Sequence, residues 1–397
     1  MIKRIKIVKY VLIISLTIVL AVGGYATYVR LPTGTDFELT TPPAERLEEL
    51  ITLTNHDKTI NPNLYAASTY QPGEPLFNAI IAIQQSRWYD AGELLKPLVE
   101  QGNADAMFWL ADITYRSSAF SGWEGAELFE KSAKLGNPYA ALKLSPKFNS
   151  YQCKMRMGAY CDEKWGEIGL DILKKKAENG DVKSAYSYLL YTRFDDKSFD
   201  YFDQFLDVTK KAVETKYYRP LRHLVDMYEK REQLNPYSRE VIPLEVEDRK
   251  VLAKLLMIAA LDNDLPSIYL LSNIFEDVIQ SEEKFEYIVK QNFPALDLDH
   301  YSIAHRYFLK KYKKTNNREH LIEGYAYSIL FDSYDNDGST LNRRIFERKI
   351  KDTGAKELNS NEKSSARIIY KKLVEKASFT TYIDEARDAW DTPLDGY

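Results

Sequence analysis

Apolar and polar positions follow helical spacing through the stretch from Tyr89 to Leu144. The apolar residues before Gly102 fall at i, i+3, i+4, i+7 and i+8, which places them on one face of a helix. These residues are Ala91, Leu94, Leu95, Leu98 and Val99. A similar helix precedes Gly136, and an alanine-rich helix follows each glycine. A helix-turn-helix unit is thus repeated after 34 residues, from Gly102 to Gly136, and a period in this range predicts a stacked α-solenoid.

The dipeptides Gly102-Asn103 and Gly136-Asn137 explain why one helix ends and another begins at these points. Glycine just past a helix end can adopt the left-handed conformation that closes the last turn. Asparagine beside it can accept hydrogen bonds from the free N–H groups of the next helix. Pro138 strengthens the second copy, because proline fits the first helical position, where its missing N–H is not needed.

These residues resemble the Sel1-like repeat, a relative of the tetratricopeptide repeat. In the first copy the pattern continues through Ala104, Ala106, Leu110, Ala111 and Tyr115. Fainter copies lie at Lys176–Asp181 and Ala259–Asp264, and a weaker one at Ala212–Lys216, where lysine takes the place of glycine. The resemblance covers residues 88 to 275. It implies an all-α, right-handed α-solenoid of helix-turn-helix repeats that binds other proteins. Its turn residues would be Gly102, Asn103, Gly136, Asn137, Gly180, Asp181, Asn263 and Asp264.

The helical pattern extends beyond the repeats, and few windows alternate with the period of a strand. We assign residues 76–275 to the repeat solenoid, with a capping helix at Leu76–Ser86. Residues 276–397 form a degenerate helical extension, whose last helix is expected at Ile383–Trp390. Because a solenoid adds repeats without a domain boundary, we expect one continuous superhelix.

The N-terminus has the features of a membrane anchor. Lys3, Arg4, Lys6 and Lys9 precede an uncharged, mostly apolar run from Tyr10 to Val29, which is long enough to cross a hydrocarbon core of about 30 Å. Positive charge before the run places the bulk of the chain on the far side of the membrane. Residues 1–29 are therefore interpreted as a single-pass anchor in the inner membrane of a Gram-negative cell, facing the periplasm. A cleaved signal peptide is the alternative. Residues 30–75 would form a tether and a short helix.

Two cysteines, Cys153 and Cys161, lie close together in the insertion that lengthens the third repeat interval. In an oxidising compartment such a pair in an irregular loop favours a disulfide. Two free thiols are the alternative. A metal site is disfavoured because no histidine lies near and two sulfurs do not complete a tetrahedral zinc site.

The sequence shows no catalytic constellation. The five histidines are His56, His223, His300, His305 and His320, and none has the i, i+4 spacing of a zinc-binding pair. No serine sits in a G-x-S-x-G elbow. Asp335–Gly338 hints at a calcium loop, but its register puts Arg344 where a bidentate glutamate is needed. The net charge of −4 argues against a nucleic-acid binder. We therefore expect no enzyme activity, no cofactor and no metal.

The expected function is stoichiometric binding of a protein partner. Exported Sel1-like proteins resemble immunity proteins that neutralise toxins of the type VI secretion system, notably phospholipases. The alternative is a scaffold or regulatory adaptor that organises envelope proteins. The chain contains 29 tyrosines, which suit both repeat packing and protein interfaces. The pattern does not indicate which surface binds the partner.

Overall fold

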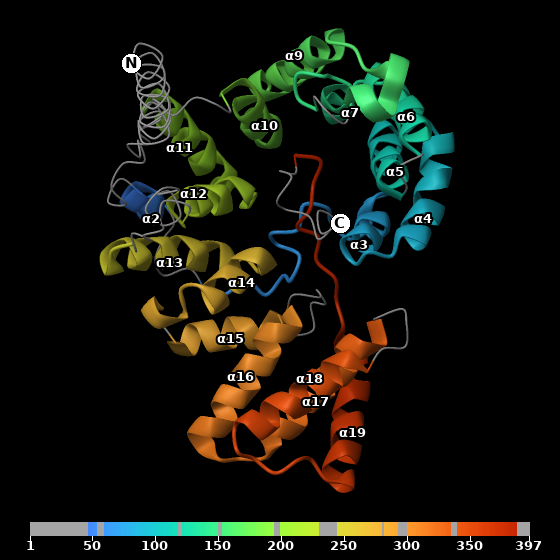
Figure 1. Cartoon of the computed structure of the whole chain (residues 1–397). Helices are drawn as coiled ribbons and strands as arrows, with labels where there is room; N and C mark the ends of the chain where they lie inside the picture. The colour runs from blue at the N-terminus through green and yellow to red at the C-terminus, as the bar shows by residue number, and fades with distance from the viewer. Residues whose placement is uncertain are drawn as a thin grey trace, which may run out of the picture.

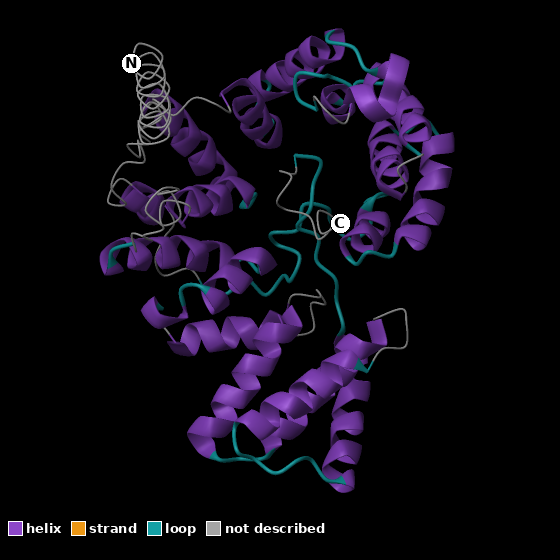
Figure 2. Cartoon of the chain, viewed as in Figure 1, coloured by secondary structure: helices purple, strands orange, loops and turns teal. Residues whose placement is uncertain are grey.

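The computed structural model describes residues 47–53, 59–117, 121–149, 153–193, 199–229, 244–279, 282–292, 300–334 and 340–386. Within these ranges the chain is helical, and its nearest approach to a strand is one isolated bridge residue, Ser378. Figure 1 shows the helices arranged in an arc, and Figure 2 shows loops passing through the centre of that arc. The predicted anchor at residues 1–29 lies outside the described residues. No helix in the described ranges is both long and apolar enough to span a membrane.

The helices follow one another as hairpin pairs. In chain order they are α2 (Glu48–Leu53), α3 (Phe77–Gln84), α4 (Trp88–Glu100), α5 (Ala104–Ser117), α6 (Gly122–Lys134), α7 (Pro138–Lys143), α9 (Lys164–Glu178), α10 (Val182–Arg193), α11 (Phe199–Glu214), α12 (Arg219–Glu229), α13 (Val246–Ala260), α14 (Leu265–Asn273), α15 (Glu282–Asn292), α16 (His300–Thr315), α17 (Glu319–Tyr334), α18 (Leu341–Asp352) and α19 (Ser360–Lys376). Short helical turns η2 (Cys153–Met157), η3 (Gly158–Tyr160) and η5 (Glu276–Val278) lie between them. From α3 to α14 each of these helices contacts the next along the chain, which is the packing mode of a solenoid.

The turns after α4, α6, α9, α11 and α13 share one backbone geometry. Each has a residue of positive φ just past the helix: Gly102 (82°), Gly136 (95°), Gly180 (91°), Lys216 (61°) and Asn263 (67°). The N–H of the following residue then donates to a carbonyl five residues back, as Asn103 does to Leu98 at 3.0 Å. This bond satisfies a carbonyl that the helix end would otherwise leave without a partner.

The residue after the positive-φ position starts the next helix. The side-chain oxygen of Asn137 accepts from the N–H of Ala140 at 2.8 Å, and that of Asp264 accepts from Ser267 at 3.1 Å. Lys216 adopts the same left-handed conformation as the glycines, although its side chain does not favour it. The weak copy at Ala212–Lys216 therefore forms a turn of the same geometry as the clear copies.

Glycines allow the helices to approach closely. A Cβ atom added at Gly125 in α6 would lie 2.8 Å from the Cβ of Tyr115 in α5. One added at Gly169 in α9 would lie 2.9 Å from the Cγ of Leu142 in α7. Neither position has room for a larger side chain without a shift of the neighbouring helix, so these glycines set the spacing between stacked pairs.

The insertion between α7 and α9 is held against the repeat stack. A disulfide joins Cys153 and Cys161, whose Cα atoms are 5.5 Å apart. The Arg156 guanidinium lies 4.0 Å from the ring centroid of Tyr115 and donates to the Tyr115 carbonyl at 2.5 Å. The insertion is thereby fixed to α5, the third helix before it.

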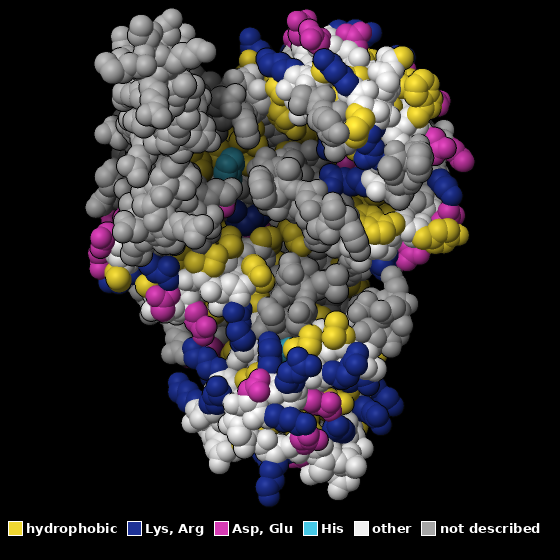
Figure 3. All heavy atoms as spheres, viewed as in Figure 1, with side chains coloured by type: hydrophobic (Ala, Val, Ile, Leu, Met, Phe, Trp, Pro, Cys, Tyr) yellow, Lys and Arg dark blue, Asp and Glu magenta, His cyan; other side chains and the backbone are white. Residues whose placement is uncertain are grey.

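The C-terminal helices pack around α17, which contacts α16, α18 and α19. His305 of α16 and Ser328 of α17 form a buried hydrogen bond of 2.8 Å between Nε2 and Oγ. Figure 3 shows Lys and Arg side chains gathered at this end of the face in view. Of the basic run on α16, Lys310 and Lys311 form ion pairs of 2.6 Å with Glu276 and Glu286.

The chain then leaves α19 and returns to the centre of the arc as residues 377–386, here called the C-terminal segment. The expected helix at Ile383–Trp390 is wrong over residues 383–386, which are not helical. The physical reason is that two adjacent carboxylates in this stretch pair with cations on different helices, as described below. The all-α class is confirmed, and the packing agrees with an α-solenoid. The handedness and the domain limits stay predictions.

Candidate functional site

The candidate site is the inner face of the arc, where α5, α7, α10 and α12 meet two extended stretches of chain. One stretch is the loop at residues 59–76, and the other is the C-terminal segment. Figure 1 shows both passing between the two limbs of the arc. We call the side chains of Tyr70, Trp109, Lys183 and Arg219, which receive the C-terminal segment, the inner-face site.

Backbone groups hold the middle of the C-terminal segment. The Thr69 N–H donates to the carbonyl of Thr381 at 2.9 Å, and the Tyr70 N–H donates to the Thr381 hydroxyl at 2.9 Å. The Thr381 hydroxyl in turn donates to the Tyr70 carbonyl at 2.9 Å. On the other side, Gln84 at the end of α3 accepts from the N–H of Tyr382 at 3.0 Å. The segment is therefore held in an extended form by bonds on both of its edges.

Glu385 enters a pocket of mixed aromatic and basic character. Its carboxylate accepts hydrogen bonds from the hydroxyl of Tyr70 and from Nε1 of Trp109, the latter at 3.3 Å, and forms an ion pair with Lys183. The Glu385 side chain is only 5% exposed, whereas that of Lys183 is 29% exposed. Charge-assisted hydrogen bonds of this kind are about twice as strong as neutral ones. Burial, followed by the charge of Glu385, raises the pKa of the Tyr70 hydroxyl, which therefore stays a donor.

Asp384 pairs with a second helix. Its Oδ1 atom lies 3.1 Å from Nη1 of Arg219 at the start of α12, and both side chains are almost fully buried, at 0% and 3% exposure. Burial alone would raise the pKa of the Asp384 carboxyl, but the charges of Arg219 and Lys183 outweigh it and hold this pKa below its ordinary value. The segment thus pairs Asp384 with a cation on α12 and Glu385 with a cation on α10.

Lys183 sits over aromatic rings as well as beside a carboxylate. Its Nζ lies 5.6 Å from the ring centroid of Tyr70 and 5.9 Å from that of Tyr139 in α7. Burial would lower the pKa of Lys183, yet the negative charges of Glu385 and Asp384 and the hydrogen bond to Glu385 raise it above its ordinary value. Lys183 is therefore a permanent cation at neutral pH, and cation–π contacts add to its position.

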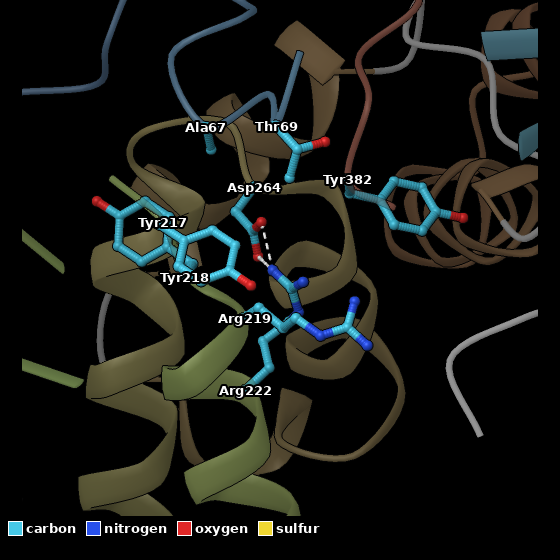
Figure 4. A pocket seen from close by; sticks show the side chains of 8 residues that line it. All are labelled: Ala67, Thr69, Tyr217, Tyr218, Arg219, Arg222, Asp264 and Tyr382. Atoms are coloured by element: carbon cyan, nitrogen blue, oxygen red, sulfur yellow. Dashed lines mark hydrogen bonds and ion pairs between the residues drawn. The ribbon is translucent and has the colours of Figure 1, made fainter. Parts of the chain in front are cut away.

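A shallow pocket lies beside Arg219. It is lined by Ala67, Thr69, Tyr217, Tyr218, Arg219, Arg222, Asp264 and Tyr382. Figure 4 shows Arg222 bonded to Asp264 at one side of the pocket, and their ion pair measures 2.6 Å. The ring of Tyr382 is turned away from the pocket. With the side chains placed as they are, the pocket leaves essentially no room for a water molecule, and so none for a cofactor.

The turn at Ala259–Asp264 fixes the other end of the loop at residues 59–76. Asp262 accepts from Nδ2 of Asn61 at 2.8 Å and from the hydroxyl of Tyr218 at 2.5 Å. Asn263 donates through its Nδ2 to the carbonyls of Asn61 and Asn63, both at 2.9 Å. This turn, predicted as a repeat turn, thus also ties the loop to the second limb of the arc.

The histidines in the described residues do not converge on this site. His305 is buried, and burial followed by the charge of Lys349 lowers its pKa to about 3. His223 shares a 2.9 Å hydrogen bond with the Tyr186 hydroxyl. Within the described ranges no three His, Cys, Asp or Glu side chains are grouped to hold a metal ion. His56 and the hinted calcium loop at residues 335–338 lie outside those ranges.

Sequence reasoning located the turns but missed the inner-face site. Lys183 lies just after the predicted turn residues Gly180 and Asp181, and the Asp181 carboxylate accepts from its N–H at 3.1 Å. No local pattern marks Lys183, because its partner Glu385 is 202 residues away. The adjacent pair Asp384-Glu385 is the available signal, but it lies in the stretch Ile383–Trp390 that the sequence predicts as a helix.

Comparison with known proteins finds only distant similarity to solved structures. No family model matches the chain, and no curated protein matches it. Among solved structures, a similar chain is a protective antigen of uropathogenic Escherichia coli displaying an SLR fold. The identity is 16%, the TM-score is 0.38, and the match covers 72% of this chain and 56% of that one. This chain therefore spans just over half the length of that protein. A similarity at this level assigns no function.

Proposed function

We propose that this chain is a non-enzymatic binding protein whose inner face takes up an extended segment of a partner protein. The observation that carries the proposal is that the inner face already holds an extended polypeptide, its own residues 377–386, through backbone hydrogen bonds and two buried ion pairs. A surface preformed by rigid helices binds with little ordering cost.

The finer proposal is that the partner is an antibacterial toxin of the type VI secretion system, of the phospholipase-like class, which this chain neutralises in the periplasm. Support comes from the order of residues 1–29, a basic stretch followed by an uncharged, mostly apolar run, which suits export, and from a disulfide, which suits an oxidising compartment. Divergent turns and an inserted, pinned loop suit a surface adapted to one opponent. In this proposal the chain remains at the inner membrane through residues 1–29, or is released after cleavage.

Where a gene beside this one encodes a secreted lipase or other effector, the experiment expresses that effector in the periplasm of a sensitive strain, with and without this chain. Survival should require the chain, and a complex of the two proteins should copurify. A variant lacking residues 1–29, fused to a cleavable signal peptide, tests the anchor separately. Survival that is the same with and without this chain would refute the immunity function.

A scaffold for envelope proteins is the second candidate. It is favoured by a second exposed surface on the outer helices, where Tyr89 in α4 is 79% exposed and Trp123 in α6 is 53% exposed. Exposed aromatic side chains are typical of protein interfaces. A scaffold would bind different partners at the two faces, so crosslinking should recover complexes that contain two partners at once. Recovery of one toxin alone would exclude it.

A further inference from the structure

We propose that the C-terminal segment is a displaceable internal ligand, and that the partner binds the inner face through an extended segment carrying two adjacent carboxylates. This inference rests on the proposed function, and it names the chemistry of the partner's bound element. The occupant is a segment of the partner protein, with residues 377–386 as its competitor.

The C-terminal segment follows α19 and is neither a helix nor a β-strand. The hydrogen bonds and ion pairs described above join it to side chains and to the loop at residues 59–76. None of them uses the backbone of a helix, so release of the segment would break no helix hydrogen bond, although it would expose the buried side chains of Ile383 and Ala386.

The charges of the C-terminal segment match those of the inner-face site. With the segment in place, Lys183 and Arg219 are matched by Glu385 and Asp384. Removal of the segment would break both ion pairs. A partner segment that carries two carboxylates on neighbouring residues would restore both, whereas a neutral segment would restore neither.

The site binds the backbone of the segment and its carboxylates through different groups. The Thr69 N–H and the Gln84 side chain bind backbone groups of the segment, at 2.9 Å and 3.0 Å, and so accept any sequence in extended form. Selectivity for a particular sequence comes instead from the cations Lys183 and Arg219. Because Lys183 and Arg219 lie on separate helices, α10 and α12, the site also fixes the spacing of the two carboxylates. A neutral extended peptide would satisfy the backbone groups but not the cations.

The experiment measures binding of a fluorescein-labelled peptide, of the sequence of residues 377–386, to the full chain by fluorescence anisotropy. In the wild-type chain the covalent segment competes at high effective concentration, so binding should be weak. In the variant Asp384→Asn/Glu385→Gln the internal competitor lacks its charges, and the labelled peptide should bind at least tenfold more tightly. A peptide with the same two changes should bind neither protein. The matched control, Asp352→Asn/Glu375→Gln, removes two exposed carboxylates from α18 and α19 and should behave as wild type.

A second variant allows the proposal to be tested even if Asp384→Asn/Glu385→Gln is less well folded than the wild-type chain. The side-chain oxygens of Thr69 and Thr381 lie 3.4 Å apart, so Thr69→Cys/Thr381→Cys places two thiols within reach of a disulfide. Added to Asp384→Asn/Glu385→Gln and oxidised, this lock should hold the segment in place and reduce peptide binding at least tenfold. Equal binding by locked and unlocked proteins, or equal binding of acidic and neutral peptides, would overturn the proposal. If the acidic peptide binds as expected while the toxin assay shows no protection, the immunity function fails and the site stands.

Discussion

The buried ion pair between Asp384 and Arg219 gives the sharpest prediction about the C-terminal segment. Asp384→Asn removes the negative charge while keeping the size of the side chain, and it leaves Arg219, only 3% exposed, beside a neutral amide. Removing one partner of a buried pair costs about 3–5 kcal/mol. Because the segment can detach, this loss should appear as local opening rather than as unfolding of the helices.

The assay is hydrogen exchange at single amides in the native protein. The N–H of Thr381 donates to Ser68 and that of Tyr382 donates to Gln84, so both exchange only when the segment opens. With about 1.4 kcal/mol for each tenfold change, 3–5 kcal/mol corresponds to exchange faster by roughly a hundredfold to a few thousandfold. The amide of Ala140, bonded to the Asn137 side chain in α7, should be unchanged.

Two further variants separate charge from shape. Arg219→Met/Asp384→Leu replaces the pair by apolar side chains of similar size and should recover most of the protection lost in Asp384→Asn. Asp352→Asn, at an exposed position in α18, should leave exchange in the segment at the wild-type rate. Exchange at Thr381 that stays within threefold of wild type in Asp384→Asn would refute the view that this ion pair holds the segment.

Three other predictions follow from local features. The pKa of the Asp384 carboxyl is lower in the folded chain than in the unfolded chain. Its stabilising contribution is therefore present above about pH 4 and is lost as the pH falls through the folded-state pKa. Hydrogen exchange in the C-terminal segment, corrected for the intrinsic effect of pH, should accordingly become faster in acid. Gly125→Ala places a Cβ 2.8 Å from that of Tyr115 and should lower the free energy of unfolding in urea by about 1–3 kcal/mol, whereas Gly92→Ala, with open space inside α4, should raise it by up to about 1 kcal/mol. Lys216→Gly relieves a left-handed non-glycine backbone and should raise the melting temperature, with a gain of about 1 kcal/mol, and a lower melting temperature would contradict this.

Local chemistry explains what could be predicted from the sequence. Glycine followed by asparagine fixes both the end of one helix and the start of the next, so the turn at Gly136-Asn137 needs no information from elsewhere in the chain. The turn at Lys216 was harder, because lysine has no preference for positive φ. There the packing of α11 and α12 determines the backbone.

The inner-face site could not be predicted, because it is assembled from distant parts of the chain. Glu385 meets Tyr70, Trp109 and Lys183, which lie 315, 276 and 202 residues away. Apolar spacing around Glu385 suited a helix, and only the tertiary arrangement of cations on α10 and α12 makes the extended form more favourable. The disulfide between Cys153 and Cys161 could be predicted, because the two cysteines are close in sequence and the N-terminal pattern indicates an oxidising compartment.

The central claim is that the inner face exchanges its own C-terminal segment for a segment of a partner. The most direct measurement is hydrogen exchange across the full chain, with and without an effector protein that copurifies with it. The account predicts that complex formation exposes residues 377–386 while it preserves or increases protection at Tyr70 and Lys183. Protection gained elsewhere, with residues 377–386 exchanging as they do in the free chain, would contradict it.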